Sequence, residues 1–302
     1  MSTRRQAGAT RDPVRRRALP STAMGDLAID TSLRSLGNDR FTATLSRDWE
    51  IWGPNGGYMA AFALGAARET SGRARPANAT VHFLGVASFD APIEITATVQ
   101  RATRQATSVH VRIDQLGKPI LAAMVWAVDT GIDGLEHGDA PAPSVPPWQE
   151  LPTMSERMAA DPDATPSRYG FWRNFEQRPA AWVGVQAWDQ RQLGRAQYEE
   201  WLHFASPPAA DEWAQAARLL LLVDLGGWPA IGRRHRTEEW VAPSIDVSCE
   251  FHHLDPSNGW CLLQGTSPVA RDGLIGSHQQ VWNEHGDLVA SGISHLLCRR
   301  IG

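Results

Sequence analysis

An internal repeat of roughly 168 residues runs through this chain. Pro76 precedes a predicted strand in the first half as Pro243 does in the second, and Gly117 and Gly286 each lie in the turn before a last strand. The two pairs have nearly the same separation although they lie in unrelated turns. Because this period is too long for a solenoid, the chain is predicted to hold two copies of one larger unit.

Each copy is predicted to contain one strand, one long helix and four further strands, from the alternation of polar and apolar residues and from the alanine- and leucine-rich runs. The first copy comprises Phe41–Trp52, the helix Tyr58–Glu69, Ala79–Ser88, Ile93–Arg101, Thr107–Asp114 and Ile120–Asp129. The second comprises Tyr198–Phe204, the helix Asp211–Leu225, Ser244–His252, Trp260–Thr266, Ile275–Asn283 and Leu288–Arg299. An antiparallel sheet curled around a single helix is the hot-dog arrangement. The sequence therefore predicts an α+β double hot-dog fold.

Three turn-rich segments divide the chain: the N-terminal tail, residues 131–167 and a loop at 229–243. The middle segment reads as a surface linker, because proline interrupts helices and central strands; its prolines are Pro141, Pro143, Pro146, Pro147, Pro152, Pro162 and Pro166. The predicted organisation is a disordered basic tail (1–25), an N-terminal hot-dog (26–130), a proline-rich linker (131–180) and a C-terminal hot-dog (181–302).

Composition and missing motifs exclude several classes of protein. The chain is 42% hydrophobic and 21% charged, which suits a folded core. Its net charge is −4 although the tail is rich in arginine, so the body is acidic and nucleic acid is not expected as the main partner. No apolar run approaches the ~20 residues of a membrane span, and no secretory signal is recognisable.

Cysteine spacing and the absence of cofactor motifs narrow the chemistry further. The three cysteines, Cys249, Cys261 and Cys298, predict neither a disulfide framework nor a zinc site, so a cytoplasmic location is expected. Neither a serine-hydrolase elbow nor a zinc-protease, P-loop or dinucleotide-binding motif is present. No metal and no cofactor are expected.

Five short segments stand beside the predicted helices and in the last strands: Trp52–Tyr58 and Val81–Leu84 in the first half, then Leu222–Asp224, Pro243–Asp246 and Gly286–Ser291 in the second. In this order and spacing they resemble the bacterial acyl-CoA thioesterase II (TesB-like) family of double hot-dog proteins. The resemblance covers roughly residues 40–130 and 180–300.

The resemblance implies hydrolysis of fatty acyl-CoA thioesters by a helix aspartate, a strand threonine and a strand glutamine near the C-terminus. Asp224 matches the aspartate, and Ser244 stands at the threonine position and keeps its hydroxyl. The glutamine position falls on Ser294, or on His295 if the register is shifted by one residue. This departure from the family pattern raises the alternative of a binder without turnover, because serine is too short to hold a water where a glutamine amide would.

Asp224 is also the leading candidate on physical grounds. It closes the apolar run Leu219–Val223, so its carboxylate is expected to be partly buried, where a charge needs a partner or a shifted pKa. As a general base it would activate a water against a thioester carbonyl. The competing interpretation is a helix-terminal aspartate with local hydrogen bonds only.

Strict alternation in Ser244–His252 predicts a strand with one apolar and one polar face. Ile245, Val247, Cys249 and Phe251 are expected to pack on the helix. Ser244 then lies on the polar face, beside Asp246 as a reserve carboxylate, and would orient Asp224 or the attacking water. The alternative is a solvated strand face.

Two further groups are candidates for contacts with the substrate. Gly56 and Gly57 begin a helix, where free N–H groups favour negative charge, so the Gly57 N–H is the proposed oxyanion donor; a tight turn is the alternative. Arg233, Arg234 and Arg236 would meet the phosphates of coenzyme A, unless they are only solvated.

The predicted function is hydrolysis of acyl-CoA to free acid and coenzyme A, with acyl-CoA as the small-molecule partner. A non-catalytic acyl-CoA or hydrophobic-ligand binder is the rival. A hydratase acting on enoyl-CoA is a third possibility, but it would need a visible Asp/His pair at a helix start. A homodimer or homotetramer is expected, with the polar face of Ser244–His252 as one surface for self-association.

Overall fold

The computed structural model describes residues 24–165, 167–188 and 190–301. The predicted tail lies outside these residues except for Met24 and Gly25. The first half contains α1 (Leu27–Asp30), β1 (Arg34–Gly37), β2 (Arg40–Ala43), the 3-10 helix η1 (Arg47–Trp49), α2 (Gly56–Ser71), β3 (Arg75–Phe83), β4 (Ile93–Ala102), β5 (Ala106–Gln115) and β6 (Lys118–Val128).

The second half begins with the short elements η2 (Trp148–Glu150), α3 (Met154–Ala160), η3 (Gly170–Asn174), β7 (Phe175–Pro179) and α4 (Val185–Trp188). It continues with β8 (Gln197–Phe204), α5 (Glu212–Leu225), α6 (Gly227–Arg234), β9 (Trp240–Val241), β10 (Ser244–Phe251), β11 (Trp260–Arg271), β12 (Leu274–Asn283), β13 (Leu288–Leu297) and β14 (Arg299–Arg300).

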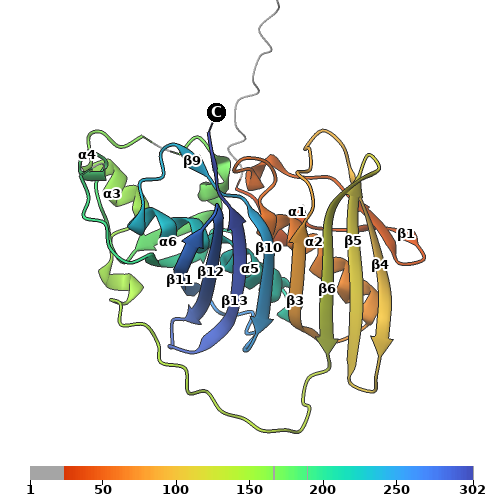
Figure 1. The fold of residues 1–302 in the computed structure, drawn as a ribbon. Coiled ribbons are helices and arrows are strands. Elements are labelled where there is room, and N and C mark those ends of the chain that lie inside the picture. The colour runs from red at the N-terminus through yellow and green to blue at the C-terminus, as the bar shows by residue number, and fades with distance from the viewer. Residues whose placement is uncertain (1–23, 166, 189, 302) are drawn as a thin grey trace, which may run out of the picture.

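One 12-stranded sheet joins the two halves, in the order β1-β2-β4-β5-β6-β3-β10-β13-β12-β11-β8-β7. Figure 1 shows β3 and β10 side by side at the centre, where the first half meets the second. They pair antiparallel, with Thr80 opposite Ser248, and the Ser248 hydroxyl donates to Thr80 Oγ1 at 3.1 Å. These two residues are 168 positions apart, the offset of the repeat. The halves therefore meet through equivalent strands, and the predicted double hot-dog fold is confirmed.

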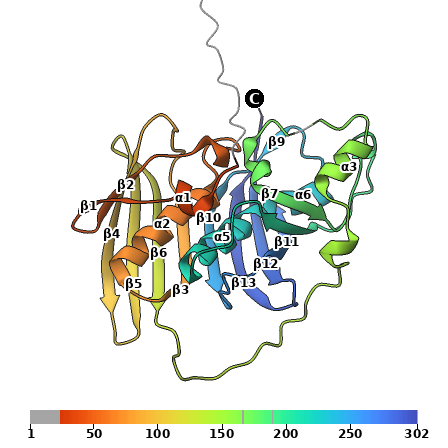
Figure 2. The same ribbon diagram turned by 180° about the vertical axis from the view of Figure 1, so that it is seen from behind.

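The helices α2 and α5 lie together on one face of this sheet, as Figure 2 shows from behind. Both are apolar and buried over most of their length, because each contacts the sheet and the other helix. They approach each other closely at Gly57, where an added Cβ would lie 2.5 Å from Leu221 Cα. This close approach brings the N-terminus of α2 to the C-terminal part of α5.

None of the helices in the described ranges is long and apolar enough to cross a bilayer.

The strand predicted at Phe41–Trp52 ends at Ala43. Ser46 caps a short 3-10 helix by accepting the Asp48 N–H, and this turn directs Trp49 into the core. The Trp49 side chain is fully buried and stacks on Tyr58, with ring centroids 5.6 Å apart. Aromatic packing against the first turns of α2 thus replaces the expected extended backbone.

Part of the predicted loop at 229–243 is helical, since α6 runs to Arg234. Pro229 is compatible with this helix because it lies in the first turn, where its missing N–H would have no partner in any case. The predicted strand at Ala79–Ser88 begins earlier, at Arg75, and ends at Phe83.

The predicted linker has two parts. Residues 131–147 carry no helix or strand and run from β6 along the outside of the molecule, as Figure 1 shows. The remainder includes α3 and β7, and β7 pairs with β8 at the edge of the C-terminal half of the sheet. The linker prolines in the described residues lie where the chain is irregular, and Pro166 lies outside those residues, whereas β7 ends on a proline at the sheet edge.

Candidate functional site

Asp224 stands near the C-terminus of α5 and faces the N-terminus of α2. Its Oδ2 accepts a hydrogen bond from the Gly57 N–H at 2.9 Å. A Cβ at Gly56 would lie 2.6 Å from the same oxygen, so only glycine leaves room for the carboxylate there. The two predicted candidates, the helix aspartate and the Gly56–Gly57 pair, therefore form one site at the junction of the two helices.

The environment of Asp224 disfavours its charge. Burial raises the pKa of the Asp224 carboxyl to about 6, against an ordinary value of 3.8, while the Ser244 side chain and the Gly57 N–H act to lower it. The Asp224 Oδ1 atom is buried and has no hydrogen-bond partner within the described part of the chain. A carboxylate with this pKa and a free acceptor oxygen is suited to take a proton near neutral pH.

Ser244 reaches Asp224 through a backbone irregularity that the alternation of residues did not reveal. The pairing of β10 with β13 shifts between Ser244 and Asp246, which leaves Ile245 as an extra residue in β10. Such a bulge reverses the in–out order beyond it. Ile245, predicted to be buried, is 37% exposed, and Ser244 points toward the helices rather than to the outer face with Asp246.

Ser294 and His295 lie on opposite faces of β13. Ser294 is buried on the face that carries the helices. His295 lies on the outer face, where its Nδ1 contacts Asp246 Oδ1 at 3.0 Å. Because neighbouring residues of a strand point to opposite sides, only Ser294 faces the side of Asp224. The Asp246/His295 pair thus lies on the outer face of the sheet, whereas the hydratase hypothesis would need an Asp/His pair at a helix start.

The Gly57 N–H, predicted as the oxyanion donor, is already used by Asp224 Oδ2. The Gly56 N–H is the first of α2, and no acceptor in the described ranges contacts it. An N–H group at a helix start is unpaired within the helix and carries the positive end of its dipole. At this site the free donor is therefore Gly56 rather than Gly57.

The three predicted arginines are not brought together. Arg233 donates to the Ala181 carbonyl at 2.7 Å and Arg234 to the Gly194 carbonyl at 3.4 Å, so both hold the segment before β8. Arg236 instead lines a cavity of about 320 Å³ together with Arg271 and the rings of Trp228 and Trp240; Ile231, His235, Thr237, Ala270, Asp272, Gly273, Leu274, Ile275 and Cys298 complete the lining.

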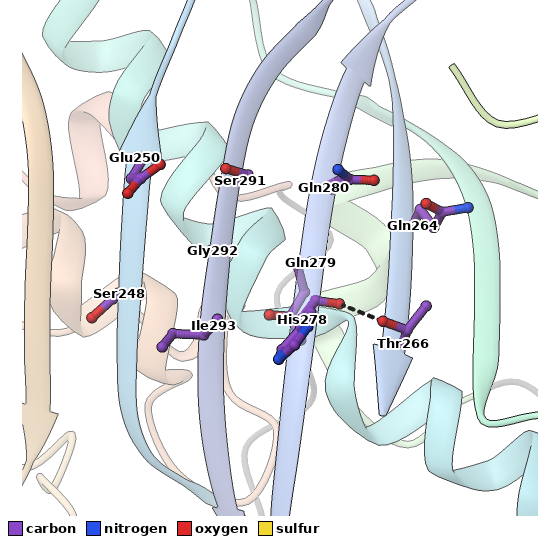
Figure 3. Close-up of a pocket in the computed structure, with 10 residues that line it drawn as sticks. All are labelled: Ser248, Glu250, Gln264, Thr266, His278, Gln279, Gln280, Ser291, Gly292 and Ile293. Atoms are coloured by element: carbon purple, nitrogen blue, oxygen red, sulfur yellow. Dashed lines mark hydrogen bonds between the residues drawn. The ribbon is translucent and has the colours of Figure 1, made fainter. Parts of the chain in front are cut away.

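A larger cavity, of about 500 Å³, lies on the outer face of the C-terminal half of the sheet, away from Asp224 (Figure 3). Thr266 in β11 donates to the carbonyl of His278, its partner in β12, at 3.5 Å. Its lining is mostly polar and comprises Ser248, Glu250, Gln264, Thr266, His278, Gln279, Gln280, Ser291, Gly292 and Ile293. Self-association through this face stays a prediction.

Glu200 is a second buried carboxylate, and sequence reasoning missed it. It is 3% exposed, accepts from Gln177 Nε2 at 3.2 Å, and burial raises its pKa to about 7. Its position in β8, next to Leu202 on the same face, was the available signal. In the described ranges, no group of three or more His, Cys, Asp or Glu side chains is arranged to hold a metal ion.

Comparison with known structures supports the fold over nearly the whole chain. An acyl-CoA thioesterase II TesB2 from Mycobacterium marinum has a TM-score of 0.74 at 18% identity, covering 92% of this chain and 99% of that chain. A conserved hot-dog protein from Alicyclobacillus acidocaldarius has a TM-score of 0.74 at 21% identity, covering 93% and 100%. The tesB protein of Mycobacterium avium has a TM-score of 0.71 at 18% identity, covering 91% and 99%.

Sequence comparison points the same way at the level of the family. No curated protein matches the chain significantly. The family model of the acyl-CoA thioesterase N-terminal domain matches residues 45–128, and that of the C-terminal domain matches residues 142–296. The second match alone spans more than half of the chain. The chain thus belongs to the acyl-CoA thioesterase family, and it has the double hot-dog fold.

Proposed function

We propose that this protein hydrolyses acyl-CoA thioesters with Asp224 as the general base. The observation that carries the proposal is the buried Asp224 carboxylate, which has one oxygen held by the Gly57 N–H and the other without a partner. A carboxylate with one oxygen held by a hydrogen bond and the other oxygen free can take a proton from a water without losing its orientation.

The proposed reaction begins at the Asp224 carboxylate. Asp224 takes a proton from a water as the water oxygen bonds to the thioester carbonyl carbon, and the carbonyl oxygen becomes negatively charged. The Gly56 N–H, at the positive end of α2, would stabilise that oxygen. The C–S bond then breaks, and the coenzyme A thiolate receives the proton. The products are the free acid and coenzyme A.

The cavity beside Arg236 would hold the nucleotide end of the substrate. Arg236 and Arg271 suit phosphate oxygens, and the rings of Trp228 and Trp240 suit a base. Its lining residue Ile275 pairs with Leu296, which pairs with Ser244. Ile275 at the cavity and Ser244 at the site are therefore two strand spacings apart, about 10 Å. A pantetheine arm spans this distance.

Thiol release from a panel of short, medium, long and aromatic acyl-CoA esters tests the proposal. Release from at least one member is expected. Each ester is paired with its N-acetylcysteamine counterpart, which lacks the nucleotide, and the coenzyme A ester is expected to have the lower KM. Tight acyl-CoA binding in calorimetry without release from any member would make the protein a binder, the alternative that Ser294 raises.

The pH dependence of the reaction should report the pKa of Asp224. Because only the deprotonated carboxylate accepts a proton, kcat/KM is expected to rise about tenfold per pH unit below pH 6 and to level off above it. The pKa of Glu200 is close to this value, at about 7, so Glu200→Gln serves as the control. This variant should keep the rise of kcat/KM that levels off near pH 6. If the rise of kcat/KM with pH disappears in Glu200→Gln, the titrating group is Glu200 instead.

A further inference from the structure

Three exposed apolar side chains lie in two loops beside the candidate site. Trp52, in the loop of residues 50–55 before α2, is 48% exposed. Leu84 and Val86, in the loop of residues 84–92 after β3, are 55% and 79% exposed. A Cβ at Gly53 would lie 2.9 Å from Val86 Cγ1, so the two loops touch. Trp52, Leu84 and Val86 are called the apolar patch below, and neighbouring exposed apolar side chains of this kind mark binding surfaces.

Hydrogen bonds hold both loops in place. In the first loop, the Ile51 N–H donates to the Gly53 carbonyl at 3.0 Å. In the second, the N–H groups of Leu84 and Gly85 donate to the Ile120 carbonyl, at 2.8 Å and 3.2 Å. The patch is therefore presented by ordered backbone, and a ligand can bind it without the cost of ordering the loops.

Phe83 connects the patch to Asp224. It is the last residue of β3, directly before Leu84, and its partly buried ring packs against the core. A Cβ at Gly56 would lie 2.6 Å from Asp224 Oδ2 and 2.9 Å from Phe83 Cζ. The carboxylate and the ring are therefore immediate neighbours at the start of α2, and the apolar surface begins next to the proposed general base.

The patch and the cavity beside Arg236 lie on opposite sides of the site. In the strand order β3-β10-β13-β12, Phe83 ends the strand on one side of β10, in which Ser244 lies. Ile275, at the cavity, lies in β12, two strands from Ser244 in the other direction. A thioester has two arms, one on each side of its carbonyl carbon. If the coenzyme A arm extends toward β12, the acyl arm extends toward β3 and the patch.

The chemistry and the extent of the patch suit an alkyl chain of medium length. Its three side chains carry no charge, and the charged neighbours Arg47 and Asp90 pair with each other at 3.0 Å. Gly53, which meets Val86, lies three residues before Gly56, so at most about 11 Å separates this contact from the site. A medium-length acyl chain covers that distance.

We propose that the acyl chain of the substrate binds along Phe83 and the apolar patch, which makes medium-length alkyl groups the preferred acyl groups of this protein. This rests on the proposed hydrolysis of acyl-CoA. The chain leaves the thioester carbon at Asp224, crosses the Phe83 ring and covers the exposed side chains of the two loops. Each methylene added within the patch strengthens binding, because it removes apolar surface from water on both partners.

Chain-length dependence in the wild type is the first part of the test. For straight-chain esters, kcat/KM is expected to rise about two- to fourfold per methylene from butanoyl-CoA to decanoyl-CoA, since a fully buried methylene contributes about fourfold and one on an open surface contributes less. Beyond the patch the rise should level off. Equal kcat/KM across this series would overturn the inference while the hydrolysis stands.

The double variant Leu84→Asn with Val86→Asn removes most of the patch. Both side chains are exposed, so the stability of the fold is expected to change little. The rise of kcat/KM should fall below about 1.5-fold per methylene, because the chain no longer covers apolar side chains. The butanoyl ester, which has the least alkyl chain to bind, should keep its kcat/KM within about threefold. A rise as steep as that of the wild type would overturn the inference.

The matched control is Leu135→Asn with Val99→Asn, the same two replacements at exposed positions elsewhere. Leu135 lies in the irregular segment 131–147. Val99 lies in β4, four residues beyond Ile95, which stands in the same row across the sheet as Phe83, so about 13 Å of strand separates Val99 from that row. The control should keep the chain-length dependence of the wild type.

Calorimetry with S-alkyl-CoA thioethers, which have no carbonyl to hydrolyse, decides the inference independently of turnover. The Kd should fall with alkyl length in the wild type and should lose this dependence in the double variant. Absence of thiol release by the wild type would overturn the hydrolysis alone, and a Kd that does not depend on alkyl length would overturn the inference. If the double variant does not fold, Trp52→Gln is measured in the same way.

Sedimentation at several protein concentrations tests the other occupant of the patch, a second copy of this chain. The double variant and the wild type are expected to have the same oligomeric state. An oligomer of the wild type that dissociates in the double variant, with the chain-length dependence unchanged, would make the patch a subunit contact and overturn the inference.

Discussion

Replacement of Asp224 by asparagine is expected to lower kcat by about 10²- to 10⁴-fold, with KM nearly unchanged. Asparagine keeps the shape and still accepts from the Gly57 N–H, but it cannot take a proton from water. The measurement is thiol release under single-turnover and steady-state conditions with the best substrate of the panel.

The free energy of unfolding shows whether Asp224→Asn loses activity because the base is absent or because the protein unfolds. Because burial raises the pKa of Asp224, the folded state binds more protons than the unfolded state between about pH 4 and pH 6. The free energy of unfolding of the wild type should therefore fall as pH rises through this window. Asp224→Asn should show a smaller fall, because the raised pKa of Glu200 still contributes in this window, and it should be the more stable protein above pH 6. Equal kcat in both proteins would remove Asp224 as the base.

Asp246→Asn is the matched control for this substitution. Asp246 was the reserve carboxylate of the sequence, and it lies on the outer face with His295. The control should keep wild-type kcat. If kcat falls in Asp246→Asn and not in Asp224→Asn, the general base lies on the outer face.

Replacement of Gly57 by alanine is expected to destabilise the fold by about 3 kcal/mol and to reduce activity in the protein that still folds. The new Cβ would lie 2.5 Å from Leu221 Cα, a backbone atom that cannot rotate away. The helices α2 and α5 would have to separate, and the hydrogen bond from the Gly57 N–H to Asp224 would lengthen with them.

Gly65→Ala is the matched control, since Gly65 lies in the same helix. Its added Cβ would meet only the Leu33 side chain, with Cδ1 at 3.4 Å and Cγ at 3.7 Å, which are ordinary contacts. Alanine is the better helix former, so this variant should be as stable as the wild type or up to about 1 kcal/mol more stable. Urea denaturation of both variants checks the pair, and equal midpoints would show that the helix contact at Gly57 is not tight.

The repeat and the hydrophobic periodicity predict most of the fold, because strands and helices bury one face each and leave that pattern in the chain. The long, strongly patterned elements, such as α5 and β12, were predicted nearly at their bounds. The segment from Leu45 to Trp52 was not, since a capped turn and the packing of Trp49 on Tyr58 decide its path. Neither of these contacts has a periodic signature.

The candidate site, like the fold, could be predicted from the sequence only in part. Neighbouring residues alone predict that Asp224 ends an apolar helix and that Gly56 and Gly57 begin another, because helix starts and burial along a helix leave a local pattern in the sequence. Three features could not be predicted in this way: the two helix ends meet, a bulge turns Ser244 inward, and Phe83 lies against the start of α2. Each of these depends on contacts between residues far apart in the chain, and strand pairing and helix packing establish such contacts only when the whole sheet has formed.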